Sequence, residues 1–273
     1  MELEQAVKSY SAKGIGVAAI TYDSPAILKN FASRRAITFP LLSDEGSRVI
    51  RAYGILNTNI AADSPAYGVP FPVTYLLDAK GRVKRKYFEE DHRERYSAAN
   101  ILVREFKTSG AAGQEIEAKH LKLRTSASNA SIYPGSRVLL TLDVTLPAKM
   151  HVYAPGVAGY RPIEWTMAES KGWIATAPEF PLSKKLHLKA IGETVPVYER
   201  TLRISRDLIA GQAAELKPVL TGEGNLVVEG VFRYQACDDK VCYAPESVPL
   251  KWLFPAGQLD GERVPAELRK TVQ

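Results

Sequence analysis

Cysteine is scarce in this chain, and its scarcity limits the chemistry that the chain can perform. The 273 residues include only Cys237 and Cys242, and no cysteine lies between residues 1 and 236. Thiol chemistry is therefore confined to one short segment. The sequence also lacks a glycine-rich loop for phosphates or dinucleotides and a Gly-x-Ser-x-Gly elbow. These absences exclude the nucleotide-binding proteins and serine hydrolases that depend on such motifs.

Long apolar runs are missing as well. None approaches the ~18 residues that a membrane-spanning helix needs, so we predict no membrane span. Residues 1–4 have neither a basic start nor an apolar continuation, so no signal peptide is predicted in this chain. The net charge is +6, and its densest basic cluster, residues 82–86, is interpreted as a solvated strand face rather than a nucleic-acid or acidic-lipid site.

The two cysteines lie close together, at positions 237 and 242. Three interpretations stay open: a redox-active pair, a structural disulfide, and free or metal-binding thiols. A structural bridge over so short a loop would stabilise the fold by only about 2 kcal/mol. A metal site needs three or four ligands. We predict no metal and no cofactor, because the histidines that could add ligands are not beside the pair in the sequence: His92, His120, His151 and His187.

The segments on either side of the cysteines indicate a hairpin. Residues 225–234 and 247–254 are rich in β-branched and aromatic residues, which is typical of strands. The cysteines would then lie at the turn of the hairpin, where sulfur can be reached by another molecule.

The cysteine segment, Tyr-Gln-Ala-Cys-Asp-Asp-Lys-Val-Cys-Tyr-Ala-Pro followed by Ser-Val-Pro-Leu, resembles the cysteine hairpin of the DsbD N-terminal domain family. That family tends to have one more residue between its cysteines. The resemblance implies an immunoglobulin-like sandwich and a periplasmic or other extracytoplasmic location. It also implies that Cys237 and Cys242 carry electrons from a membrane-embedded donor to a thioredoxin-like or DsbD-type redox partner.

Residues 150–156, Met-His-Val-Tyr-Ala-Pro-Gly, resemble another segment of such sandwiches and are expected near the hairpin. Tyr153 and Tyr243 are candidate partner-binding residues. Together with Tyr234 they form either an aromatic cover that shields the sulfurs or ordinary core and rim tyrosines. His151 is either a proton acceptor for a thiol or a structural residue.

The second half of the chain has the pattern of an all-β sandwich, with proline and glycine at turn spacing. We place a small-residue linker at 109–114, a domain boundary near 112, the sandwich at 113–257 and a polar, loosely held tail at 258–273. The expected strands are 121–126, 137–146, 151–153, 163–168, 184–190, 195–204, 226–234 and 248–254.

The first half, residues 1–112, alternates helices and short strands, which indicates an α/β domain. We expect helices at 2–13, 25–35, 44–53 and 93–107, and strands at 15–22, 38–42, 71–78 and 82–88. The runs Phe-Pro-Leu-Leu-Ser-Asp (39–44) and Phe-Pro-Val-Thr-Tyr-Leu-Leu-Asp-Ala-Lys-Gly-Arg (71–82) resemble the redoxin family, a thioredoxin-like group that includes peroxiredoxins of the alkyl hydroperoxide reductase type. By this resemblance Pro72 occupies the place of the cis-proline that faces the active thiol, and it is a candidate partner-binding residue.

The resemblance to redoxins is incomplete, because their reactive cysteine lies where a central strand meets a helix, and here that strand and cysteine are absent. Two strands, near 15–22 and 71–78, would then lack ladder partners. Three explanations stay open: a misplaced start codon that hides a signal peptide and the cysteine, a degenerate scaffold, or a gap filled by a partner chain or the second domain. The predicted fold is thus an incomplete thioredoxin-like domain followed by an immunoglobulin-like sandwich.

Three hypotheses for the function follow. In the first, Cys237 and Cys242 perform thiol–disulfide exchange with a thioredoxin-like partner. In the second, the complete protein is a peroxiredoxin-type antioxidant enzyme. In the third, the sandwich is a non-enzymatic interaction module.

Overall fold

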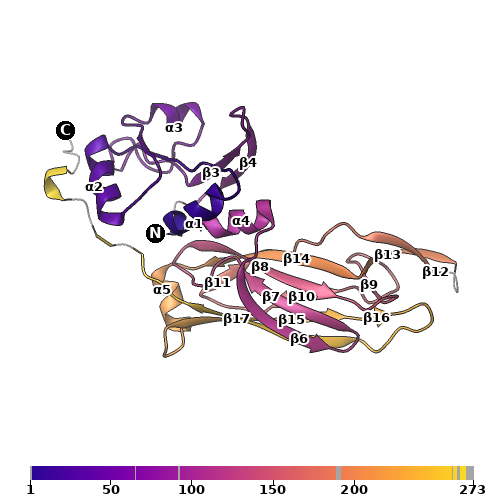
Figure 1. Ribbon diagram of the computed structural model, residues 1–273. Helices are drawn as coiled ribbons and strands as arrows, with labels where there is room; N and C mark the ends of the chain where they lie inside the picture. Colours follow the sequence, from indigo (N-terminus) through magenta and orange to yellow (C-terminus); the bar gives the residue numbers. More distant parts are fainter. Residues whose placement is uncertain are drawn as a thin grey trace. The chain divides into compact units, whose positions relative to one another are not determined.

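The computed structural model describes residues 2–64, 66–91, 93–188, 192–259, 261–262 and 265–268. The chain divides into two compact units, Met1–Lys107 with Gln258–Gln273 and Thr108–Gly257. Figure 1 labels the elements of both units. Within the described residues no helix has the length and apolar character needed to cross a membrane. His92, one of the histidines considered above, lies outside the described residues.

The first unit alternates helices with short strands, as the sequence pattern predicted. In chain order its elements are α1 (Glu2–Ser11), β1 (Ala19–Thr21), α2 (Pro25–Arg35), β2 (Leu41–Ser43), α3 (Arg48–Ala52), β3 (Val73–Leu77), β4 (Val83–Phe88), β5 (Arg95–Tyr96) and α4 (Ala98–Phe106).

Helix α2 shows how local chemistry sets an element's bounds. The Ser24 side chain accepts the backbone N–H of Ile27 at 3.4 Å, and Pro25 occupies the first turn, where its missing N–H costs no hydrogen bond. The helix ends at Ala36, which adopts a left-handed conformation with φ of 49°. The helix occupies the predicted range 25–35.

The strands of the first unit form two separate pairs. Strands β1 and β2 are parallel, and β3 and β4 form an antiparallel hairpin. Within the described residues, β1 and β3 each have one ladder partner, in agreement with the expected gap in the centre of the sheet. Ile20 on β1 and Leu77 on β3 are exposed at 41% and 47%, which is unusual for apolar residues on central strands.

The peptide bond before Pro72 differs from that of the family proline to which Pro72 was compared. No peptide bond in the described part of the chain is cis, so the bond before Pro72 is trans, unlike that of the redoxin proline to which it was compared. Pro72 is half-buried and its carbonyl accepts the Glu89 N–H at 3.1 Å. Its place is therefore set by the edge of the β3–β4 hairpin.

The ends of the first unit are held by specific contacts. Tyr10 of α1 is buried and donates its O–H to the Ala98 carbonyl at 2.8 Å, which joins α1 to α4. In the described part of the C-terminal tail, Glu262 forms ion pairs with Arg34 and Arg35 of α2. The tail is therefore attached at one point at least, although we expected it to be loosely held.

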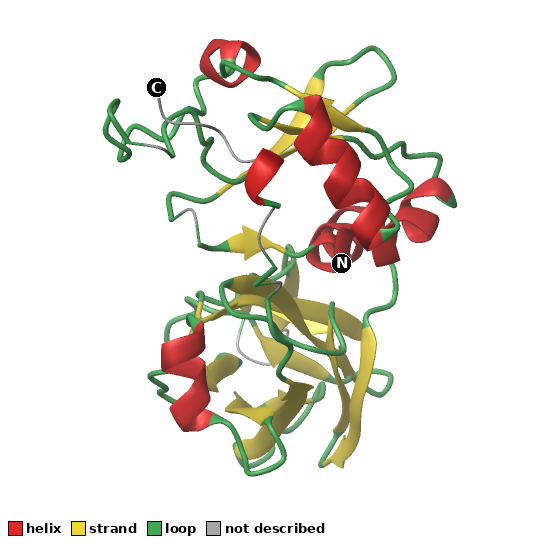
Figure 2. Ribbon diagram, turned by 90° about the vertical axis from the view of Figure 1, so that its left-hand side faces the viewer, coloured by secondary structure: helices red, strands yellow, loops and turns green. Residues whose placement is uncertain are grey.

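The second unit is built almost entirely of strands, drawn in yellow in Figure 2. Its elements are β6 (Ala111–Ala118), β7 (Leu121–Ala127), β8 (Ser136–Thr145), β9 (His151–Tyr153), β10 (Glu164–Met167), β11 (Trp173–Ala175), β12 (Lys184–Leu188), β13 (Glu193–Glu199), β14 (Thr201–Ala210), α5 (Ala213–Leu216), β15 (Asn225–Tyr234), β16 (Ala236–Cys237) and β17 (Glu246–Pro255), with a short 3₁₀ turn (Lys217–Val219) after α5.

These strands form three sheets. The larger one has the order β11-β14-β8-β7-β6, a second has the order β10-β15-β17, and a third has the order β12-β13-β9-β16. Strands β15 and β17 alternate buried and exposed residues, as expected for sheets with one face on a core.

The core lies between the larger sheet and the β10-β15-β17 sheet. The rings of Trp165 on β10 and Trp252 on β17 stack at 5.7 Å, and the Trp252 indole donates to the Ser126 carbonyl of β7 at 3.1 Å. Leu142 on β8 and Phe232 on β15 belong to the same buried cluster and are fully buried. This packing is the immunoglobulin-like sandwich that the sequence predicted.

Two local expectations for the second unit are wrong. The run 195–204, expected as one strand, is divided at Arg200, whose φ of 61° turns the chain between β13 and β14. The small residues 109–114 are no free linker, because β6 begins at Ala111. A Cβ at Gly110 would lie 2.1 Å from the Ala127 carbonyl oxygen, and one at Gly113 would lie 2.1 Å from that of Thr125. The glycines therefore permit close pairing.

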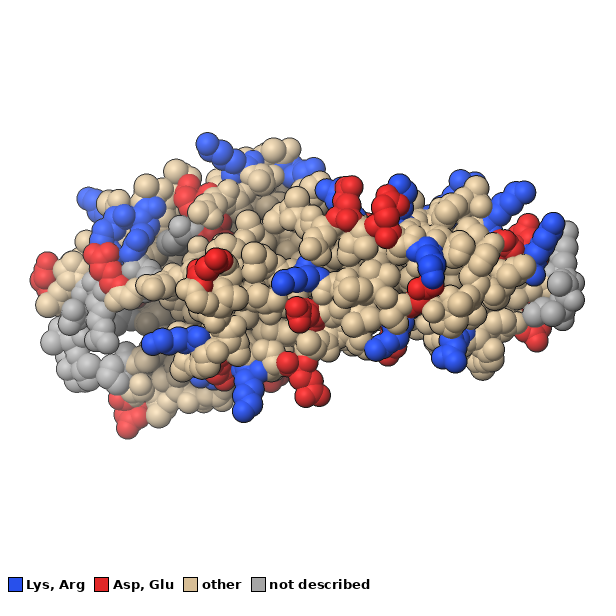
Figure 3. All heavy atoms as spheres, turned by 90° about the horizontal axis from the view of Figure 1, so that it is seen from below, with Lys and Arg blue, Asp and Glu red and all other residues tan. Residues whose placement is uncertain are grey.

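Charges of both signs are mixed on the surface shown in Figure 3. Ion pairs across neighbouring strands join some of the protein's exposed charges, such as Arg233 with Glu164 at 3.1 Å and Lys122 with Glu117 at 2.7 Å. Exposed pairs of this kind contribute at most about 1 kcal/mol each.

Candidate functional site: the Cys237–Cys242 loop

A long hairpin carries the cysteine segment. Strands β15 and β17 pair antiparallel over ten residue pairs, from Asn225 with Pro255 to Tyr234 with Glu246. Residues 235–245 form the connecting loop, as the flanking strand patterns predicted. The loop begins by joining a different sheet, because β16 pairs with β9 (Figure 1).

The two cysteines form a disulfide bond at the tip of this loop. The S–S distance is 2.09 Å and the two Cα atoms are 4.1 Å apart. Cys237 and Cys242 face each other in an isolated antiparallel bridge, and the Asp238 N–H donates to the Val241 carbonyl at 2.9 Å. The cysteines thus close a very small hairpin of their own, and the pair is oxidised in this structure.

The two halves of the disulfide differ in accessibility. Cys237 is fully buried and packs with Tyr153, Val195 and Val197. Cys242 is exposed. The expectation that sulfur can be reached at the turn therefore agrees with the exposure of Cys242 and is wrong for Cys237, because β16 carries Cys237 into the sheet.

Tyr153 contacts Cys242, the exposed cysteine of the pair. Its hydroxyl lies 3.6 Å from Cys242 Sγ, and the hydroxyl is the donor because a disulfide sulfur carries no hydrogen. Burial is the main cause that raises the pKa of Tyr153, so the O–H keeps its proton at neutral pH. The Tyr160 ring packs at a tilt against Tyr153, with ring centroids 4.4 Å apart. Tyr160 donates to Glu193 at 2.5 Å, and this hydrogen bond is the main cause that raises the pKa of Tyr160 to about 12.

Tyr243 and Asp238 shape the outer side of the loop. The Asp238 carboxylate accepts the backbone N–H groups of Lys240 and Val241, both at 2.8 Å, and the Tyr243 hydroxyl at 3.0 Å. These bonds lower the pKa of Asp238, the backbone bond from Lys240 contributing most. The Tyr243 ring also stacks on His120 at 3.9 Å.

Of the three tyrosines considered from the sequence, Tyr153 and Tyr243 lie at the loop and Tyr234 does not. Tyr234 belongs to the sandwich core, stacks on Phe232 and donates its hydroxyl to the Lys119 carbonyl at 2.6 Å. Tyr160 and His120 were not anticipated. Both come from segments far away in the sequence, and no local pattern marks them.

His151 is a direct neighbour of Cys237. The two residues are paired across β9 and β16, so residues 150–156 lie beside the cysteine hairpin, as their resemblance to such sandwiches led us to expect. Within the described residues, no group of three or more His, Cys, Asp or Glu side chains is arranged to hold a metal ion.

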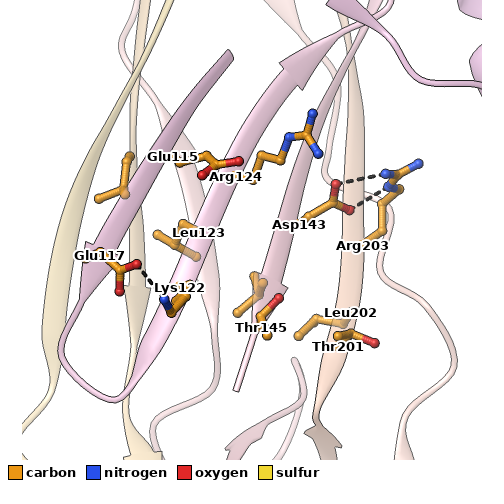
Figure 4. A pocket seen from close by; sticks show the side chains of 12 residues that line it. Glu115, Glu117, Lys122, Leu123, Arg124, Asp143, Thr145, Thr201, Leu202 and Arg203 are labelled. Atoms are coloured by element: carbon orange, nitrogen blue, oxygen red, sulfur yellow. Dashed lines mark hydrogen bonds and ion pairs between the residues drawn. The ribbon is translucent and has the colours of Figure 1, made fainter. Parts of the chain in front are cut away.

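A shallow hollow elsewhere in the second unit is not part of this site. It lies on the outer face of β6, β7, β8 and β14, and its lining contains no residue of the cysteine loop. Four of its charged side chains are paired across strands, Arg203 with Asp143 at 2.6 Å and Lys122 with Glu117 at 2.7 Å (Figure 4). We therefore interpret it as a solvated sheet face.

Two family models match this chain. Residues 1–86 match the AhpC/TSA family, and residues 118–250 match the family described as thiol:disulfide interchange protein DsbD, N-terminal. The chain thus combines a thioredoxin-like redoxin domain with a DsbD N-terminal-type, immunoglobulin-like domain that contains Cys237 and Cys242. Both resemblances inferred from the sequence are confirmed.

Individual relatives match the first domain. Thiol-disulfide oxidoreductase ResA of Geobacillus thermodenitrificans is 30% identical over 77 residues, which are 28% of this chain and 37% of the relative. ResA of Bacillus anthracis is 28% identical over 86 residues, 31% of this chain and 42% of the relative. The chloroplastic peroxiredoxin Q of Triticum aestivum is 33% identical over 97 residues, 35% of this chain and 42% of the relative. The chain therefore spans less than half the length of these curated relatives.

Two solved structures are similar to this chain. The N-terminal periplasmic domain of ScsB from Proteus mirabilis has 17% identity and a TM-score of 0.35, covering 52% of this chain and 51% of that one. The N-terminal domain of Neisseria meningitidis DsbD in the reduced form has 16% identity and a TM-score of 0.29, covering 41% of this chain and 74% of that one.

Proposed function

We propose that this protein performs thiol–disulfide exchange through Cys237 and Cys242 with a thioredoxin-like partner. The observation that carries the proposal is the unequal exposure of the two halves of the disulfide. Cys237 is fully buried, whereas Cys242 is exposed and its sulfur accepts a hydrogen bond from Tyr153. A partner thiolate has one accessible sulfur to attack, and access is one of the factors that decide which sulfur reacts.

The exchange has two steps. A partner thiolate attacks Cys242 Sγ, the Cys237–Cys242 bond breaks, and Cys237 leaves as a thiolate that takes up a proton. A second partner thiol then displaces Cys242 from the mixed disulfide, so the pair gains two electrons and the partner is oxidised. In the opposite direction the reduced pair delivers the same two electrons to a disulfide of the partner.

Tyr243, on the cysteine loop, is the residue that we assign to partner contact, whereas Tyr153 is buried and supports Cys242 from within the domain. Tyr243 is half-buried, so part of its surface is available to a partner. Pro72, at the start of the β3 hairpin in the first unit, stays a prediction. We also propose an extracytoplasmic location, which fits the word periplasmic in the name of one similar structure and suits a protein that carries a disulfide.

Peroxide reduction is the weaker alternative. The AhpC/TSA match and the similarity to peroxiredoxin Q favour it. Residues 1–236 contain no cysteine, however, so the redoxin domain in this chain has no thiol of its own to attack a peroxide.

The test is a redox titration of the full chain in dithiothreitol buffers, with alkylation and mass measurement of the trapped thiols. An exchange pair is expected to become reduced at a potential above about −300 mV, whereas a structural bridge stays oxidised below that value. A pair that remains oxidised throughout would refute the proposal.

Single-cysteine variants test the direction of attack. Cys237→Ser keeps the exposed Cys242 thiol and is expected to form a mixed disulfide with an oxidised thioredoxin whose disulfide is intact. Cys242→Ser, the matched control, keeps only the buried Cys237 and is expected to react far more slowly. Equal yields from the two variants would contradict the assignment of Cys242 as the accessible sulfur.

A further inference from the structure

His151 is a buried imidazole with an unused hydrogen-bonding atom. It lies on β9 with an exposed fraction of 2%, and its Nε2 atom is buried without a hydrogen-bond partner. Buried polar atoms are nearly always paired, so an unpaired one at a reactive site needs an explanation.

The location of His151 suggests an explanation for this unpaired atom. Cys237 on β16 and Glu199 on β13 are each directly opposite His151 in the antiparallel ladders. Directly opposite residues project from the same face of a sheet, with Cβ atoms about 4.5–5.5 Å apart. The three side chains therefore form a row in the order thiol, imidazole, carboxylate. Tyr153, two residues along β9, projects from the same face and lies edge-on to the imidazole at 5.5 Å.

The charge on His151 is set by its surroundings. Burial is the main cause that lowers its pKa, while the carboxylates of Glu199, Asp239 and Asp238 oppose the shift. The imidazole is consequently neutral at pH 7 and able to accept a proton. These three carboxylates favour the imidazolium once it forms, although the Glu199 carboxylate also pairs with Lys184 of β12 at 4.0 Å.

A base is needed here, given the exchange function proposed above. When the reduced protein has formed a mixed disulfide through Cys242, Cys237 must lose its proton before it can release the partner. A buried thiol loses its proton with difficulty, because burial disfavours the charged thiolate. Water has little access to Cys237, which is fully buried.

We propose that His151 is the general base for Cys237. In this step the Cys237 S–H proton passes to His151 Nε2, and the Cys237 thiolate attacks Cys242 Sγ. The Cys237–Cys242 bond forms, the bond from Cys242 to the partner sulfur breaks, and the partner leaves as a thiolate. The imidazolium then gives its proton to solvent. Breaking the disulfide allows Cys237 Sγ to rotate away from Cys242 and toward the unpaired Nε2.

The experiment follows the reduced full-length protein after it is mixed with 5,5′-dithiobis(2-nitrobenzoate) in a stopped-flow spectrophotometer. Cys242 is expected to release one thionitrobenzoate in a first phase, and Cys237 a second one as it closes the disulfide. Cys237→Ser should show the first phase alone, which assigns the phases. The leaving thiolate of this probe needs no proton, so the second phase reports the deprotonation and attack of Cys237.

His151→Phe is expected to slow the second phase at pH 7 by about 10²-fold, the lower range for general-base catalysis, and to leave the first phase unchanged. His187→Phe is the matched control, because His187 is exposed on β12 of the same sheet, and it should leave both phases unchanged. An unchanged second phase in folded His151→Phe would overturn the proposal. If circular dichroism shows that this variant is unfolded, His151→Gln replaces it with the same expectation.

The pH dependence of the second-phase rate in the wild-type protein gives an independent test. Because the neutral imidazole is the active form and its pKa is lowered, the second-phase rate should be level between pH 7 and 9 and fall only below the ordinary pKa of histidine, about 6.5. Glu199→Gln should move this fall to lower pH. A second phase that keeps rising with pH through 7 to 9 would show direct ionisation of Cys237 and refute the role of His151. Absence of both phases in the wild type would instead refute the exchange function itself.

Discussion

Replacing Tyr153 with phenylalanine removes one oxygen atom from the site and little else. The ring of Tyr153 is buried and packs against Tyr160 with ring centroids 4.4 Å apart, and a phenyl ring keeps both features. The lost group is the hydroxyl that lies 3.6 Å from Cys242 Sγ. In the reduced protein the same hydroxyl would donate to a Cys242 thiolate, the nucleophile of the exchange reaction.

The size of the effect follows from that contact. A hydrogen bond to a charged group contributes about 1.5–3 kcal/mol, and the long O···S distance favours the lower value. Since 1.36 kcal/mol corresponds to one pKa unit, losing about 1.5 kcal/mol lowers the thiolate fraction about tenfold at a pH where the thiol form predominates. The pKa of the Cys242 thiol must shift upward, because removing a hydrogen-bond donor destabilises the thiolate.

The assay measures the rate of alkylation by iodoacetamide across a pH series, in a Cys237→Ser background that leaves one thiol. Tyr153→Phe should move the half-maximal rate about one pH unit upward. Tyr160→Phe is the control, because its hydroxyl binds Glu193 and not the sulfur. Equal pH profiles for Tyr153→Phe and its parent would show that the hydroxyl does not assist the thiolate.

Two further predictions concern the loop and the sheet. The pKa of Asp238 is lowered in the fold, so its stabilising effect is present above the ordinary value of 3.8 and is lost as pH falls through the lower, folded value. Calorimetry should find Asp238→Asn less stable than the wild type at pH 7, with a difference in Tm that narrows below pH 3.8. A difference in Tm between Asp238→Asn and the wild type that stays the same at every pH would contradict this reasoning. Gly113→Ala would place a Cβ 2.1 Å from the Thr125 carbonyl oxygen and should destabilise the protein by about 1–3 kcal/mol in urea unfolding. Gly222→Ala, whose Cβ meets no atom within 4 Å, should unfold at the wild-type midpoint, and equal midpoints for both variants would refute the close contact at Gly113.

Local signals in the sequence predicted the elements that depend on local chemistry. Ser24 and Pro25 define the start of α2, and the structure begins the helix at Pro25. The hairpin around the cysteines was predicted because residues 225–234 and 247–254 on either side are rich in β-branched and aromatic residues. The redoxin and DsbD-type motifs supplied the fold class of each half.

Features that depend on distant pairing were not predicted. The break between β13 and β14 depends on a left-handed backbone conformation at Arg200. The sequence has no glycine or asparagine at this position to indicate such a conformation. The small residues at 109–114 indicate a linker until β7 is seen to pair with them. The burial of Cys237 arises because β9 pairs with β16. The resemblance of residues 150–156 placed that segment near the hairpin, but it did not give the register that sets His151 opposite Cys237.

The ten-pair ladder of β15 and β17 has a consequence for how a partner recognises this protein. The S–S bond closes only the segment from Cys237 to Cys242, which lies beyond Tyr234 and Glu246, the last residue pair of that ladder. Reduction of the disulfide by two electrons therefore opens the small ring between Cys237 and Cys242 and leaves the paired strands β15 and β17 unchanged. We expect the oxidised and reduced forms to share one scaffold, so that a partner distinguishes them by the chemistry of a single exposed sulfur rather than by a change of shape.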